Sequence, residues 1–79
     1  MEYGKHAALA RAVEQMGIEI LGYDEYSLHL CAECGSLELE YYPPFQYDPY
    51  VSRRLEDLLA DYGYYIEWYN PARADATLD

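Results

Sequence analysis

Apolar residues recur at the spacing of an α-helix in two stretches of the chain. The first stretch is followed by Gly17, which is a typical residue just beyond a helix end. The second is preceded by Asp48 and Pro49, which suit the N-cap and the first helical position, and it is followed by Gly63. The predicted apolar faces consist of His6, Leu9, Val13 and Met16 in the first helix, and of Val51, Leu55, Leu58, Leu59 and Tyr62 in the second.

Elsewhere apolar and polar residues alternate, which is the pattern of β-strands with one buried face. The stretch "SLELEYY" shows the alternation most clearly, and the prolines after it cannot continue a central strand. The predicted strands span residues 18–23, 26–31, 36–42 and 64–69, with a turn at Asp24–Glu25 and a loop at residues 43–49.

This order, α-β-β-β-α-β, predicts an α+β fold with a small antiparallel sheet and two helices packed on one face. Residues 1–69 are expected to form a single compact domain, and residues 70–79 a flexible C-terminal tail. The sheet residues expected in the core are Ile18, Ile20, Leu28, Leu30, Leu37, Leu39, Ile66 and Trp68. By alternation, the uncovered face of the sheet would show Glu19, His29, Cys31, Glu38, Glu40, Tyr65, Glu67 and Tyr69.

The charge of the chain is strongly negative. Fifteen acidic residues stand against five basic ones, and no lysine or arginine lies between Ile18 and Val51. Such a balance opposes direct contact with nucleic acid, because phosphates would be repelled. It suits either solubility alone or a surface for a positively charged partner. The eleven tyrosines favour the partner, since tyrosine is enriched at protein interfaces.

Glu38 and Glu40 lie two residues apart and would share one face of a strand. Paired carboxylates act as general acid and base when a cleft separates their pKa values, and an open sheet face provides no such enclosure. We therefore expect a binding protein without enzymatic activity or a cofactor. The residues expected to meet the partner are Glu19, Asp24, Glu25, Glu33, Glu38, Glu40, Tyr65, Glu67 and Tyr69.

The stretch "HLCAECG" contains both cysteines of the chain, Cys31 and Cys34. Its last five residues resemble one knuckle of a zinc ribbon, although a structural zinc takes four ligands and His29 and His6 would have to complete the set. A redox motif of the thioredoxin kind would open a helix here, whereas a strand is expected to follow. The favoured interpretation is a tight turn with reduced cysteines and no metal.

No apolar run approaches the ~20 residues that a membrane span needs, and acidic and basic residues interrupt the N-terminal stretch. These features predict a cytoplasmic protein without a membrane partner.

In size, acidity and tyrosine content the chain resembles phage-encoded anti-CRISPR proteins, especially those that bind the Cascade complex of type I CRISPR-Cas systems. These proteins share no motif, so the likeness transfers no site residue. It implies an inhibitor in the host bacterial cytoplasm that mimics DNA, with carboxylates where a Cascade subunit expects phosphates. Two alternatives remain: an immunity-type inhibitor of a toxin nuclease, and a zinc-stabilised interaction module built on Cys31 and Cys34. The residues that carry the likeness are Glu19, Asp24, Glu25, Glu33, Glu38, Glu40 and Glu67.

Overall fold

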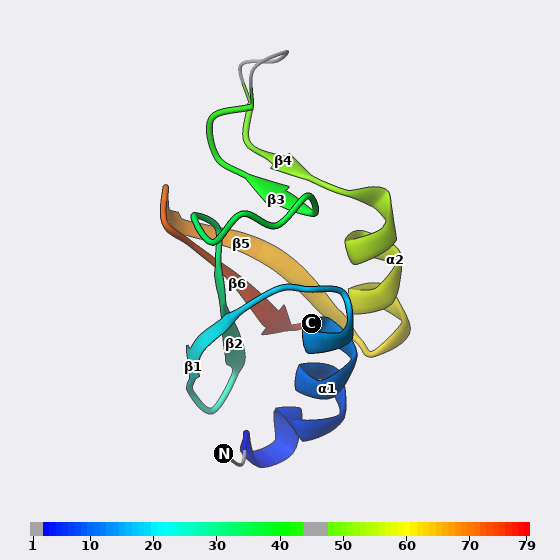
Figure 1. The fold of residues 1–79 in the computed structure, drawn as a ribbon. Coiled ribbons are helices and arrows are strands. Elements are labelled where there is room, and N and C mark those ends of the chain that lie inside the picture. Colours follow the sequence, from blue (N-terminus) through cyan, green and yellow to red (C-terminus); the bar gives the residue numbers. More distant parts are fainter. Residues whose placement is uncertain (1–2, 44–47) are drawn as a thin grey trace.

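The computed structural model of the chain describes residues 3–43 and 48–79 (Figure 1). The predicted loop at residues 43–49 therefore lies partly outside the described residues. No helix in the described ranges is long and apolar enough to cross a membrane. The elements are the 3-10 helix η1 (Gly4–His6), α1 (Ala7–Gln15), β1 (Ile20–Tyr23), β2 (Ser27–Cys31), β3 (Leu39–Glu40), β4 (Tyr50–Val51), α2 (Arg53–Asp61), β5 (Tyr64–Asn70) and β6 (Arg73–Leu78).

The main sheet has four antiparallel strands in the order β1-β2-β6-β5, and β3 and β4 form a separate two-stranded sheet. Both helices lie on the same side of the main sheet (Figure 1). The prediction of an α+β fold with two helices on one face of an antiparallel sheet is therefore confirmed. A single core joins the layers, with Leu9, Val13, Leu28, Leu30, Leu55 and Leu59 among its fully buried side chains.

The third predicted strand does not join the main sheet. Residues 32–38 bend away after β2, and the strand that remains, β3, pairs with β4. The place beside β2 is taken by β6, and Ala32 N donates to Ala72 O at 2.8 Å as the chain leaves the sheet. Leu39 is buried as expected, but Leu37 is 88% exposed, so its expected place in the core was wrong.

The second helix begins later than the sequence suggests. Val51 belongs to β4, and α2 starts at Arg53 with Ser52 as its N-cap, in place of Asp48. The Ser52 hydroxyl oxygen accepts from the backbone N–H of Leu55 at 3.1 Å, which satisfies one free donor of the first turn. Strand pairing at Tyr50 and Val51 keeps these residues extended, so the helix cannot form before Ser52.

The expected flexible tail is instead part of the core of the sheet. Residues 70–72 form a turn in which Asn70 Oδ1 accepts from Ala72 N at 2.9 Å, and β6 then runs between β2 and β5. Ala74 and Ala76 of β6 are completely buried against the helices. The prediction failed because a strand of small alanines between polar residues has little hydrophobic signal, although its alternation has the period of two expected of a strand.

Neighbouring positions of β6 provide a test of its central place. Ala76 points into the core and Thr77 to the opposite face, so Ala76→Glu buries an unpaired charge whereas Thr77→Glu leaves the carboxylate within reach of water. We expect Ala76→Glu to lower the free energy of unfolding by about 3 kcal/mol or more. Urea unfolding followed by circular dichroism measures the difference. Equal, small effects of both substitutions would show that residues 73–78 are not a core strand.

Candidate functional site

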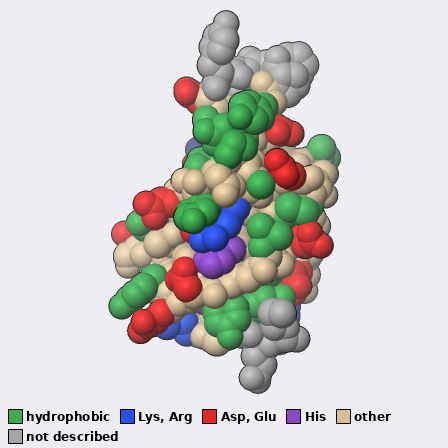
Figure 2. All heavy atoms as spheres, turned by 90° about the vertical axis from the view of Figure 1, so that its left-hand side faces the viewer, with side chains coloured by type: hydrophobic (Ala, Val, Ile, Leu, Met, Phe, Trp, Pro, Cys, Tyr) green, Lys and Arg blue, Asp and Glu red, His purple; other side chains and the backbone are tan. Residues whose placement is uncertain are grey.

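The candidate site is the face of the main sheet that points away from the helices, here named the open face. Figure 2 shows this side of the molecule, with histidine and basic side chains next to one another near its middle and acidic and hydrophobic groups around them. Strand register places His29 opposite Asp75 and Asp75 opposite Glu67, while Ser27, Thr77 and Tyr65 form the next row. The open face consists of Ser27, His29 and Cys31 of β2, Arg73, Asp75 and Thr77 of β6, and Tyr65, Glu67 and Tyr69 of β5.

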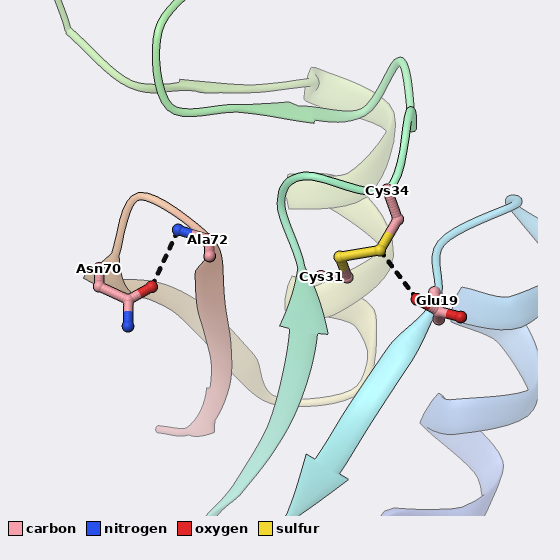
Figure 3. The surroundings of a disulfide bond; sticks show 5 residues. All are labelled: Glu19, Cys31, Cys34, Asn70 and Ala72. Atoms are coloured by element: carbon pink, nitrogen blue, oxygen red, sulfur yellow. Dashed lines mark hydrogen bonds between the residues drawn. A yellow bond between two sulfur atoms is a disulfide. The ribbon is translucent and has the colours of Figure 1, made fainter.

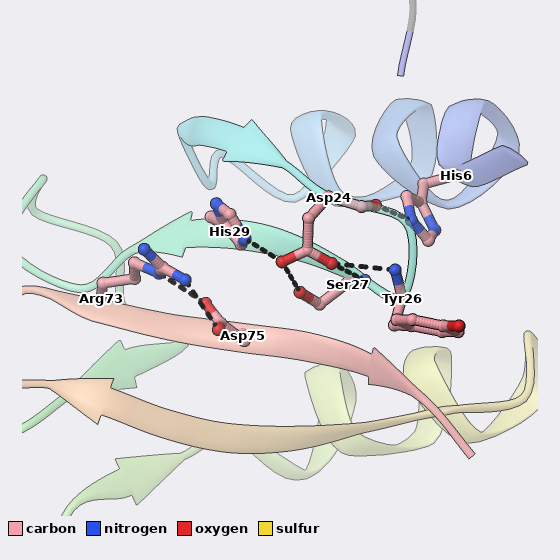
Figure 4. A network of polar contacts seen from close by, with 7 residues as sticks. All are labelled: His6, Asp24, Tyr26, Ser27, His29, Arg73 and Asp75. Carbon is pink, nitrogen blue, oxygen red and sulfur yellow. Dashed lines mark hydrogen bonds and ion pairs between the residues drawn. The ribbon is translucent and has the colours of Figure 1, made fainter. Parts of the chain in front are cut away.

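Arg73 forms the centre of one polar cluster on this face. Its guanidinium donates two hydrogen bonds to the Asp75 carboxylate, Nε to Oδ1 at 2.7 Å and Nη2 to Oδ2 at 3.0 Å (Figure 4). The guanidinium also stacks on the ring of Tyr69, 3.9 Å from its centroid. The hydrogen bonds to Asp75 raise the pKa of Arg73. Arg73 and Asp75 thus neutralise each other, and Tyr69 supports the pair.

Asp24 closes the turn between β1 and β2 and forms a second polar cluster. Its Oδ1 accepts from the backbone N–H groups of Tyr26 and Ser27 at 2.8 and 2.9 Å. Its Oδ2 accepts from Ser27 Oγ at 2.9 Å and from His29 Nε2 at 3.0 Å (Figure 4). These bonds, first of all the one from His29, lower the pKa of the Asp24 carboxyl strongly. The predicted hairpin turn at Asp24–Glu25 is confirmed, and Asp24 serves the turn as its main acceptor.

His6 is a core residue with both ring nitrogens in use. The side chain is almost fully buried, with Nδ1 2.6 Å from the Tyr64 hydroxyl and Nε2 2.8 Å from the Asp24 carbonyl oxygen. A carbonyl can only accept, so Nε2 donates to Asp24, and in the neutral ring Nδ1 then accepts from Tyr64. Burial raises the pKa of the Tyr64 phenol. His6 links η1 to the hairpin and is not placed to complete a metal site.

The acidic residues proposed to meet a partner do not all share one surface. Glu67 lies on the open face and is exposed, and Glu25 and Glu33 are exposed in the turns at the two ends of β2. Glu40 is exposed on β3 of the small sheet. Glu38 is half-buried, and its Oε1 accepts from Ser52 Oγ at 2.5 Å, so it supports the N-cap of α2. The expectation that Glu38 lies on the uncovered sheet face was wrong.

The two cysteines form a disulfide, which overturns the prediction that they are reduced. Cys31 ends β2 and Cys34 lies in the exposed turn after it (Figure 3). Glu19, directly before β1, places Oε2 at 2.8 Å from Cys34 Sγ. The "HLCAECG" stretch is therefore the end of β2 followed by a turn, as favoured, and a covalent bond closes the turn. His29 of this stretch is bound to Asp24.

The sequence prediction does not include Arg73, Asp75 and Thr77 of the open face, because it assigns residues 70–79 to a flexible tail. Their alternation with Ala74 and Ala76 is the signal that could have found them.

A small pocket of about 170 Å³ lies between α2 and β5, lined by Glu56, Leu59, Ala60, Tyr64, Tyr65 and Ile66. Comparisons of the chain with protein families, with curated proteins and with solved structures found no match.

Asp24→Asn tests the charge on the turn. Asparagine retains an oxygen for the N–H groups of Tyr26 and Ser27 but carries no charge toward His29. Because folding lowers the pKa of Asp24 below its ordinary value of 3.8, the carboxylate stabilises the fold above that value. This stabilisation is lost progressively as the pH falls from there toward the lowered pKa of the folded chain. We expect Asp24→Asn to be less stable than the parent at pH 7. The difference in free energy of unfolding between Asp24→Asn and the parent should narrow from about pH 5 downward.

Urea midpoints of the parent and of Asp24→Asn, measured at pH 7 and pH 3, provide the comparison. An equal difference between the two urea midpoints at pH 7 and pH 3 would contradict a stabilising role for the Asp24 charge.

Reduction of the disulfide should weaken the fold modestly. The bond closes a ring with a sequence separation of 3, and the chain-entropy relation gives about 2 kcal/mol for a ring of about four residues. We expect the free energy of unfolding to fall by about that amount when a reductant is added. The Cys31→Ser, Cys34→Ser double variant is the control, because reductant should not change its urea midpoint. Identical midpoints for the oxidised and reduced parent would contradict the expectation.

Proposed function

We propose that the chain is a small acidic inhibitor that binds a basic, nucleic-acid-binding surface of another protein through its open face. Its likeness in size and charge to anti-CRISPR proteins of the Cascade-binding kind makes a Cascade subunit the first partner to test. The inhibitor would then keep Cascade from its target DNA by occupying arginines and lysines that otherwise hold phosphates. The chain would act in the cytoplasm, that of the host bacterium if a phage encodes it.

The observation that carries this proposal is the uneven distribution of basic residues between the helical segments and the sheet. Of the five basic residues, Lys5, Arg11, Arg53 and Arg54 lie in the helical segments, and Arg73 lies in the sheet. Arg73 is paired with Asp75, so it does not offset the other carboxylates of the sheet side. Glu67 remains exposed on the open face, with Glu25 and Glu33 exposed at its two ends. A basic surface would be attracted to this side of the molecule.

Exposed tyrosines supply the apolar contact area that such an interface needs. Tyr65 and Tyr69 of the open face are 43% and 64% exposed, and Tyr26 at its edge is 62% exposed. Tyr69 is held in place by the stacked guanidinium of Arg73, so its ring would lose little freedom on binding. Large, partly ordered aromatic rings beside carboxylates favour binding of protein side chains over simple solubility.

The polar groups of this face satisfy one another, which favours binding over catalysis. His29 is bound to Asp24, and Arg73 to Asp75, so none of the four is directed at an empty site. The pocket between α2 and β5, at about 170 Å³, is smaller than the ~300 Å³ at which pockets for small molecules begin. The described residues therefore support a protein-binding surface better than an enclosed active site.

The test compares Glu67→Lys on the open face with Asp57→Lys on α2, which makes the same change of charge on the helical side. The tagged chain is used to capture guide-loaded Cascade, with a toxin nuclease as the second candidate. We expect Glu67→Lys to weaken capture of Cascade by at least about tenfold, because it sets like charges against each other, and Asp57→Lys to have little effect. Glu38→Lys is unsuitable, since it would also disturb the Ser52 cap.

Capture of the nuclease in place of Cascade would favour the immunity-type alternative. Equal binding by the two variants would contradict the open face as the binding surface, and failure to capture either partner would contradict the proposed function. Circular dichroism of both variants confirms that each is folded.

A further inference from the structure

Three atoms capable of binding a metal ion converge at the end of the β1–β2 hairpin. They are the sulfur atoms of Cys31 and Cys34 and a carboxylate oxygen of Glu19, all within 4.8 Å of one another (Figure 3). Cys31 is buried, whereas Cys34 and Glu19 are exposed. The group therefore has a fixed inner side and an outer side that an ion can reach from solvent.

The backbone holds Cys31 and Glu19 in place independently of the disulfide. Cys31 N donates to Glu19 O at 2.9 Å, which fixes the start of β1 against the end of β2. The next residue, Ala32, is tied to Ala72 by a further backbone hydrogen bond of 2.8 Å. Gly35 has a φ of +81°, which lets the chain turn directly after Cys34. Reduction would thus free two sulfurs on a framework that the sheet continues to position.

The contact between Glu19 and Cys34 is not a hydrogen bond in the oxidised chain. Glu19 Oε2 lies 2.8 Å from Cys34 Sγ, at hydrogen-bonding distance. A disulfide sulfur has no hydrogen to donate, and an ionised carboxylate can only accept. In the reduced chain the Cys34 thiol can donate to this oxygen, or both atoms can bind the same cation. The position of Glu19 therefore suits the dithiol form better than the disulfide.

We propose that reduction of the Cys31–Cys34 disulfide creates a binding site for a zinc-like divalent cation, with Cys31, Cys34 and Glu19 as its ligands. A reductant supplies two electrons and two protons to give two thiols, and the cation then displaces both protons to bind the thiolates. Thiolate and carboxylate oxygen are both ligands of zinc, at about 2.3 and 2.0–2.2 Å. A fourth tetrahedral position is left for water, because the site opens to solvent on the Cys34 side.

This ligand set differs from the one that the sequence suggests. The histidines considered as partners of the cysteines are both engaged elsewhere, His29 with Asp24 and His6 with Tyr64 and the Asp24 carbonyl. The third ligand is instead the carboxylate of Glu19, directly before β1, the strand that pairs with β2. A cytoplasmic location would favour the site, since that compartment keeps most thiols reduced.

The experiment uses the full chain, with and without reduction by a water-soluble phosphine. The phosphine is oxidised to its oxide with oxygen from water, so no added thiol competes for the metal. Zinc affinity is measured by competition with a chelating dye, and cadmium ion reports thiolate ligation through its charge-transfer absorption. We expect the reduced chain to bind one ion, and the oxidised chain to bind it at least about 100-fold more weakly, since a cysteine binds zinc as the thiolate and not as a disulfide.

Glu19→Gln tests the carboxylate, and Glu33→Gln is the matched control. Glu33 lies between the two cysteines, and the same substitution removes the same charge without removing a ligand. We expect Glu19→Gln to lower zinc affinity by about tenfold or more and Glu33→Gln to change it by less than about threefold. Both positions are exposed, so circular dichroism should show the parent fold in each variant.

Three outcomes would overturn the proposal: equal zinc affinity of the oxidised and reduced chains, equal affinity of Glu19→Gln and the parent, or one ion shared by two chains. Equal zinc affinity of Glu19→Gln and the parent is also the result expected if the reduced chain is unfolded, because binding by the Cys-x-x-Cys pair alone would not depend on Glu19. None of these measurements involves the proposed partner of the open face.

Discussion

The pairing of β6 with both β2 and β5 is the constraint on which the rest of the structure depends. Without this strand, the β1–β2 hairpin and β5 would be separate ribbons, and the helices would have no continuous surface to cover. Ala74 and Ala76 present small side chains toward the helices, and both are completely buried in the shared core. Because a chain of 79 residues can bury only a limited area, a middle strand that binds its neighbours on both sides is indispensable.

The same strand determines the character of the open face. Register with β2 and β5 sets Asp75 between His29 and Glu67, a row in which two carboxylates would repel each other. Arg73 relieves this repulsion by binding Asp75 bidentately, and Tyr69 supports its guanidinium from the other side. What remains directed outward is an acidic and aromatic surface whose inner polar groups are already bound to one another.

The end of the β1–β2 hairpin that carries Cys31 and Cys34 has a different chemistry in its oxidised and reduced forms. In the oxidised chain the bond closes a turn that leaves the main sheet, and it lies beside a carboxylate with which it exchanges no hydrogen bond. In the dithiol form the same three residues are a potential set of metal ligands. The open face and the turn closed by the disulfide share strand β2, since His29 and Cys31 lie on the same face two residues apart.

The sequence by itself determined the two helices, the strands at the β1–β2 hairpin and β5, the placement of Leu28, Leu30 and Leu39 in the core, and the excess of negative charge. These features follow from local periodicity and from composition, which are present in any short window of the chain. Tertiary structure alone decided that residues 73–78 form a central strand, that β3 pairs with β4, and that Glu38 holds Ser52. Each of these depends on contacts between distant residues, and in β6 the small alanines that fit under the helices give little hydrophobic signal along the chain.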